Sequence, residues 1–181
     1  RQLLPEYGMS NQSILQSKAR RTTVKTRIMA GAQHLLRLDQ EDTHDLTDSE
    51  VEQLLEIISH ALDTQEIHVI LFQDYNKGVL TPAVIPAVIA LAKSRGIFTA
   101  VDPKKANFYA YHGVDLFKPN LKEVKEGLNL LSDEVSLAAL KDIHVQLREK
   151  LKHQISFITL SEKGIFYNTP TKANLIPTHV R

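Results

Sequence analysis

The chain has 181 residues, 43% of them hydrophobic and 24% charged, which is typical of a globular domain with a sizeable core. Its 22 basic and 21 acidic side chains give a net charge of +1, which favours a small-molecule partner over nucleic acid or a membrane surface. The absence of cysteine excludes disulfides, thiolate metal sites and cysteine nucleophiles, and it fits the cytoplasm. No apolar run approaches membrane-spanning length.

The two ends of the sequence predict that the chain is part of a longer gene product. It begins at Arg1 without an initiator Met or a signal segment, and it ends at Arg181 without a visible boundary. We therefore expect a domain that is cut at both ends.

Residues 13–39 are rich in Thr, Val, Ile and Leu and alternate in polarity, which predicts antiparallel strands. The basic run at 18–21 is expected to form a charged turn between them. Because this segment lacks the pattern of the rest of the chain, residues 1–45 are expected to hold an accessory lid sheet with its connections.

From residue 46 onward, helical and strand patterns alternate. Thr47 and Glu50 form a capping box at the start of an amphipathic stretch, and Thr81 can cap a later helix. Helices are predicted at 48–62, from 81 to about 96, at 121–129 and at 136–152, and strands at 67–72, 97–101, 115–118, 155–160 and 165–167.

This alternation predicts an α/β body over residues 46–181, with a parallel sheet, right-handed crossovers and helices on both faces. Ligands of such sheets bind at the carboxyl ends of the strands. The sequence has no glycine-rich dinucleotide fingerprint, P-loop or nucleophile elbow, and its eight histidines are scattered, so none is given a role.

Polar residues follow three consecutive predicted strands and should gather at one edge of the sheet. Carboxylates accept hydrogen bonds from sugar hydroxyls and ammonium groups neutralise phosphate, so such a site suits a phosphorylated sugar. The residues are Asp74, Lys77, Asp102, Lys104, Asn120 and Glu123.

Ordinary structural roles compete with each of these assignments. Asp102 precedes a proline and could open a turn, and Asn120 with Glu123 could simply cap a helix. Lys25 and Arg27 share one face of a predicted strand and could clamp a phosphate, or they could form a solvated edge that discourages aggregation.

Five segments in order resemble the heptose 7-phosphate kinase domain of ADP-heptose synthases, a PfkB-type, ribokinase-like carbohydrate kinase. They are Thr-Thr-Val-Lys-Thr-Arg at 22–27, Leu-Leu-Arg-Leu-Asp at 35–39, Asp-Tyr-Asn-Lys-Gly at 74–78, Val-Asp-Pro-Lys at 101–104 and Pro-Asn-Leu-Lys-Glu at 119–123. The resemblance implies a three-layer α/β/α fold, of which residues 1–181 are the central part.

The resemblance also implies residue roles. Nucleotide contacts fall on Asn120, Leu121, Lys122, Glu123, Thr159 and Gly164, with Asn120 and Glu123 near Mg²⁺ through water or phosphate. Sugar-phosphate contacts fall on Asp74, Lys77, Asp102, Lys104, Lys25 and Arg27. The implied cofactors are ATP and Mg²⁺, and the lid sheet is a candidate surface for a homodimer.

The implied reaction is phosphorylation of heptose 7-phosphate at its anomeric hydroxyl, on the route to ADP-heptose and surface glycans. In this family a Gly-Ala-Gly-Asp segment supplies the catalytic base, and we expect it beyond Arg181, so the chain alone should be inactive. The alternatives are another PfkB-family sugar kinase, a non-catalytic sugar-phosphate or nucleotide-binding module, and an α/β domain with a scaffolding role.

Overall fold

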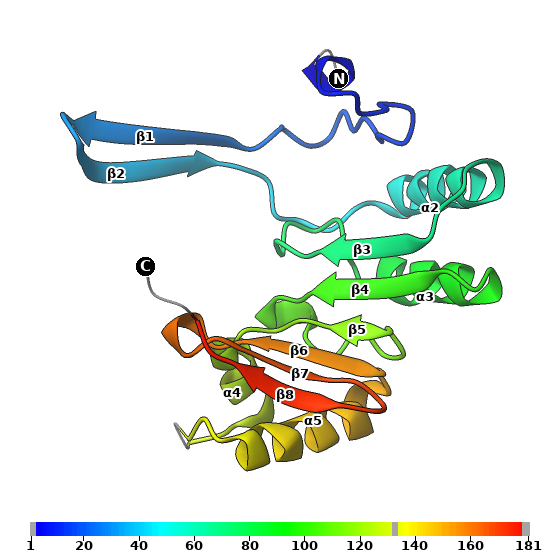
Figure 1. Cartoon of the computed structure of the whole chain (residues 1–181). Coiled ribbons are helices and arrows are strands. Elements are labelled where there is room, and N and C mark those ends of the chain that lie inside the picture. Colours follow the sequence, from blue (N-terminus) through cyan, green and yellow to red (C-terminus); the bar gives the residue numbers. More distant parts are fainter. Residues whose placement is uncertain (1–2, 132–133, 179–181) are drawn as a thin grey trace.

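The computed structural model describes residues 3–131 and 134–178, and it contains two separate sheets (Figure 1). The first is a hairpin of β1 (Val24–Ala30) and β2 (Gln33–Gln40). The second sheet and its helices comprise α2 (Asp48–Thr64), β3 (Val69–Gln73), α3 (Val84–Ser94), β4 (Phe98–Asp102), β5 (Leu116–Phe117), α4 (Leu121–Leu128), α5 (Leu137–Leu151), β6 (Ile155–Thr159), β7 (Ile165–Asn168) and β8 (Ala173–Ile176). A short helix, α1 (Leu3–Glu6), precedes the hairpin.

The hairpin is the predicted lid sheet, but its turn lies elsewhere than predicted. The strands are connected at Gly31, whose φ of 57° suits a tight turn, and not at the basic run 18–21. The basic run precedes β1, where the guanidinium of Arg20 donates hydrogen bonds to the backbone carbonyls of His44 and Lys77. These bonds fix the base of the hairpin to the α/β body.

The predicted cap Thr47 lies directly before α2, whereas the predicted cap Thr81 lies three residues before the first residue of α3. Thr47 and Glu50 form a complete capping box at α2, in which the Glu50 amide donates to Thr47 Oγ1 at 3.3 Å and the Thr47 amide to Glu50 Oε2 at 2.9 Å. Before α3, Thr81 Oγ1 accepts a hydrogen bond from the Val84 amide at 3.2 Å. Local sequence therefore sets where these helices begin.

The large sheet has the strand order β3-β4-β5-β6-β7-β8. The first four strands are parallel, and β6, β7 and β8 form antiparallel pairs. The strand β8 was not predicted, because its short run Ala-Asn-Leu-Ile has little alternation. The polar loops after β3, β4 and β5 meet at one edge of the sheet, as expected for parallel strands.

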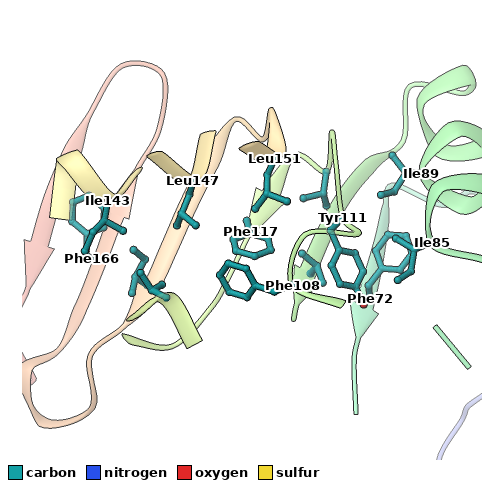
Figure 2. Close-up of a cluster of buried hydrophobic side chains, with 14 of the residues drawn as sticks. Phe72, Ile85, Ile89, Phe108, Tyr111, Phe117, Ile143, Leu147, Leu151 and Phe166 are labelled. Atoms are coloured by element: carbon teal, nitrogen blue, oxygen red, sulfur yellow. The ribbon is translucent and has the colours of Figure 1, made fainter. Parts of the chain in front are cut away.

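The core lies on one face of this sheet, beneath α3 and α5 (Figure 2). Alternate residues of β4 and β6 point into it, including Val101 and Ile158, which are fully buried. The rings of Phe108 and Phe117 meet edge to face at 5.0 Å between centroids, and Phe72 meets Tyr111 in the same way at 5.7 Å. This packing fixes the frame from which the loops project.

The helices α3, α4 and α5 connect consecutive parallel strands, so right-handed crossovers place them on the same face. On the other face, Val69 and Leu71 of β3 are 53% and 61% exposed. This is the face that the second helical layer of the α/β/α prediction would cover.

Within residues 3–131 and 134–178, no helix is both long and apolar enough to cross a membrane.

Candidate functional site

The helix α4 begins at the carboxyl edge of the sheet with the predicted Asn120 and Glu123. The Glu123 amide donates to Asn120 Oδ1 at 2.9 Å, and the Asn120 amide donates to Glu123 Oε2 at 2.9 Å. The two residues therefore form a capping box, the structural alternative weighed from sequence. The capping box fixes the start of α4, and it does not exclude a ligand contact by the exposed atoms of the two residues.

Glu123 also joins the loop after β4 to α4. Its Oε1 pairs with Lys104 Nζ at 2.8 Å, and this hydrogen bond is the main reason that the pKa of Lys104 is raised. The carboxylate is therefore held by one cation and one backbone amide. Lys104 stays charged and is 41% exposed, which leaves it able to contact an anion.

The residues at α4 do not by themselves form a metal centre. Both oxygens of Glu123 already accept hydrogen bonds, and in the part of the chain that the structure describes no three His, Asp or Glu residues are grouped to hold a metal ion. The donor set thus does not fit direct Mg²⁺ ligation. Contact through water or phosphate, as the resemblance implies, stays a prediction.

A cavity of about 630 Å³ opens between α4 and the end of β6. Four of the predicted nucleotide residues line it together with several others, namely Asn120, Leu121, Lys122, Lys125, Glu126, Leu130, Thr159, Leu160, Ser161, Glu162 and Lys163. The Thr159 amide donates to the Pro119 carbonyl at 3.1 Å, which holds the two walls together. The three lysines in its lining suit a phosphorylated ligand, although two glutamates line it as well.

Gly164 lies just outside this cavity and has a structural reason to be glycine. Its φ is 103°, and a Cβ there would lie 2.0 Å from the carbonyl oxygen of Ile176. Its own carbonyl accepts a hydrogen bond from the Leu160 amide at 2.9 Å, closing the turn after β6. A direct contact between Gly164 and a nucleotide stays a prediction.

The predicted sugar-side residue Asp74 is almost completely buried, at 1% exposed. Its Oδ2 accepts hydrogen bonds from Tyr111 Oη at 2.8 Å and Asn107 Nδ2 at 3.1 Å, and its Oδ1 accepts from the Asn76 amide at 2.6 Å. Burial, together with the hydrogen bond to Asp74, raises the pKa of Tyr111, so that hydroxyl stays a donor. Asp74 therefore shapes the loop that presents Lys77.

A second cavity, of about 660 Å³, lies between the base of the hairpin and β3. It brings together three predicted residues, Lys25, Asp74 and Lys77, with Glu41, and apolar side chains of α2, β3 and α3 form much of the rest of its lining. Asp102 and Lys104 do not line this cavity. Asp102 instead pairs with Lys118 Nζ at 3.1 Å and accepts a hydrogen bond from Gln73.

Charged side chains of the hairpin face this cavity. Lys25 Nζ lies 2.9 Å from Asp39 Oδ2, and Lys77 Nζ pairs with Glu41 Oε1. Arg27 is exposed on the same strand, opposite Arg37 in the strand register. Sequence reasoning missed Glu41, although its spacing of two from Asp39 indicates the same face of the strand.

Comparison with known proteins identifies relatives of the chain. The chain is 36% identical to the bifunctional protein HldE of Wolinella succinogenes and 38% identical to the bifunctional protein HldE of Methylobacillus flagellatus. Each match covers 90% of the present chain. It spans about a third of the length of these relatives, 33% in both cases. The chain is a homologue of the HldE proteins. No family model matches it.

Solved structures show the fold. The ribokinase of Giardia lamblia superposes with a TM-score of 0.68 at 13% identity, covering 97% of this chain and 53% of that one. Phosphofructokinase-2 of Escherichia coli superposes with a TM-score of 0.64 at 16% identity, covering 87% of this chain and 51% of that one. The predicted ribokinase-like fold is thereby confirmed, and the family resemblance stated from the sequence motifs agrees with the similarity to the HldE proteins.

Proposed function

We propose that this HldE homologue supplies the central part of an ATP-dependent sugar kinase that phosphorylates heptose 7-phosphate at its anomeric hydroxyl. The proposal is supported most by one feature: two cavities whose linings each include lysine side chains lie at the carboxyl edge of one sheet, one beside α4 and one beside the hairpin. The similarity to HldE over 90% of the chain favours heptose over other sugars.

In the proposed reaction, the anomeric oxygen of the sugar forms a bond to the γ-phosphorus of ATP while the bond to the bridging β–γ oxygen breaks. The hydroxyl proton passes to a carboxylate base, ADP leaves and the sugar 1,7-bisphosphate remains. Mg²⁺, when bound, would neutralise phosphate charge, and Lys104 and Lys122 would add to this neutralisation.

The test uses the complete gene product with ATP, Mg²⁺ and heptose 7-phosphate. We expect a new anomeric phosphate signal in ³¹P NMR and one ADP per sugar consumed, with slower turnover of fructose 6-phosphate. Faster turnover of another sugar would assign the chain to a different PfkB-family kinase. Tight ligand binding without any ADP formation would favour the non-catalytic binding module and overturn the proposal.

We also propose that two copies associate through the hairpin. Its strands pair Thr26 with Leu38 and Ile28 with Leu36, which places these residues on one face, while Lys25 lies on the other. Ile28, Leu36 and Leu38 are 42%, 50% and 50% exposed. An apolar face on an isolated two-stranded sheet favours burial against a second copy.

A further inference from the structure

Five charged side chains of alternating sign form a row from the hairpin to the loop after β3. Arg37 Nε lies 3.0 Å from Asp39 Oδ1, Lys25 Nζ lies 2.9 Å from Asp39 Oδ2 and 4.0 Å from Glu41 Oε2, and Lys77 Nζ pairs with Glu41 Oε1. The row holds three cations and two anions, which leaves it one positive charge in excess. It borders the cavity of about 660 Å³ beside the hairpin.

Glu41 is the member of this row that lies near both lysines. Lys25 belongs to β1 and Lys77 to the loop after β3, so the carboxylate bridges two parts of the chain far apart in sequence. Its side chain is only 17% exposed, and Oε2 is buried without a hydrogen-bond partner. A carboxylate in such surroundings depends on nearby cations, so its position and theirs are coupled.

The backbone around Glu41 is held independently of its side chain. Arg20 donates to the carbonyls of His44 and Lys77, and the Leu46 amide donates to the Gly78 carbonyl at 2.9 Å. The chain passes so close here that a Cβ on Gly78 would lie 1.9 Å from His44 O. Removing the charge of Glu41 should therefore release the two ammonium groups without opening this junction.

We propose that Glu41 is a positioning residue that holds Lys25 and Lys77 around the phosphate of the sugar substrate in this cavity. Without the carboxylate, the two ammonium groups repel each other and each flexible side chain gains rotamer freedom. When the Glu41 carboxylate is present, both ammonium groups are held in position to bind a phosphate dianion. The dianion then neutralises the excess positive charge of the row. The inference rests on the proposed kinase function.

The kinetic test compares Glu41→Gln with Asp42→Asn in the complete gene product. Asp42 is the next residue after Glu41, but its carboxylate interacts with Arg21 and not with either lysine. It accepts a hydrogen bond from the Arg21 amide at 2.7 Å and forms an ion pair with the Arg21 guanidinium. We expect E41Q to raise KM for the sugar phosphate about tenfold with kcat within about twofold, because ground-state binding is lost. D42N should match the unmodified protein, and an unchanged or lower KM for E41Q overturns the inference.

A second measurement does not depend on turnover. Brief acetylation followed by mass spectrometry reports how strongly each lysine is held, since an ion-paired ammonium reacts slowly. Lys77 should become more reactive in E41Q than in D42N, and the exposed Lys105 should serve as an internal reference. Equal labelling of Lys77 in both variants contradicts the positioning role, whereas absent turnover by the unmodified protein contradicts only the proposed function.

Discussion

At the scale of single residues, Asp74 connects the sequence motif to the shape of the site. Its buried carboxylate accepts from Tyr111, Asn107 and the Asn76 amide, so each of its oxygens already has a donor. The motif Asp-Tyr-Asn-Lys-Gly is thus explained in part by folding. Its aspartate orders the loop and its lysine faces the cavity.

We expect Asp74→Asn to destabilise the protein by about 2 kcal/mol, because the new amide would present hydrogens to the Asn107 donor. Urea unfolding measures this loss. Asp63→Asn is the matched control, since Asp63 is 56% exposed in its pair with Arg95 and its neutralisation should cost less than about 1 kcal/mol. Equal losses in the two variants would show that the buried network contributes little.

The second residue-scale prediction concerns two buried histidines. His153 Nε2 and His144 Nδ1 lie 2.7 Å and 2.8 Å from the hydroxyl oxygen of Ser156, and burial lowers the pKa of both rings, that of His153 to about 4. The two imidazole rings therefore bind protons less readily in the folded protein than in the unfolded chain. Stability is therefore fully present above pH 6.5 and falls as the pH decreases toward 4.

The expected contribution of His153 is about 3 kcal/mol over this interval. Urea unfolding at several pH values measures it. His153→Gln should flatten the acid side of the stability profile. A slope retained in the His153 variant would contradict the assignment.

At the scale of elements, residues 3–131 and 134–178 contain two complete capping boxes, Thr47–Glu50 at α2 and Asn120–Glu123 at α4. Only the second lies beside the cavity proposed for the nucleotide. Substitutions in the two boxes can therefore distinguish an effect on helix stability from an effect on ligand binding.

We expect Thr47→Ala and Asn120→Ala each to reduce the free energy of unfolding by about 1 kcal/mol, because each leaves one helix amide without its side-chain acceptor. Calorimetry with ATP should show weaker binding for Asn120→Ala alone. If both variants retained the affinity of the unmodified protein, Asn120 would be a cap and nothing more, and the nucleotide assignment would fail at this residue.

At the scale of the whole molecule, the hairpin stands apart from the core. None of the buried core residues belongs to β1 or β2, and Figure 1 shows the hairpin extending away from the large sheet. The core therefore does not cover the apolar residues of the hairpin. This is the physical basis for the proposed association of two copies.

We expect the double substitution Ile28→Lys and Leu36→Lys to convert dimers into monomers without lowering the melting temperature of the body, because it places charge on the apolar face. Analytical ultracentrifugation of the complete gene product measures the change. Arg27→Gln alters the opposite face and should leave the dimer intact. A monomeric unmodified protein would refute the association directly.

The sequence alone determined the order of most elements, the capping box of α2 and an α/β body, because hydrophobic period, caps and turn residues act over a few neighbouring positions. The ribokinase-like fold was implied by the family resemblance of five motifs. The sequence predicted the lid in the right region, but it predicted the turn of the hairpin at the basic run 18–21. Arg20 instead donates hydrogen bonds to backbone carbonyls far away in the sequence, and no local pattern indicates such bonds. The short strand β8 was missed for a similar reason: pairing with β7 defines it.

Only the tertiary structure decided which predicted site residues meet. It separated Lys25 and Lys77 beside the hairpin from Asn120 and Lys122 beside α4, it turned Asp74 inward, and it added Glu41. Sequence spacing reports which residues share a face of one element. Contacts between a hairpin and a loop 36 residues further on depend on how separate elements pack, which no local pattern encodes.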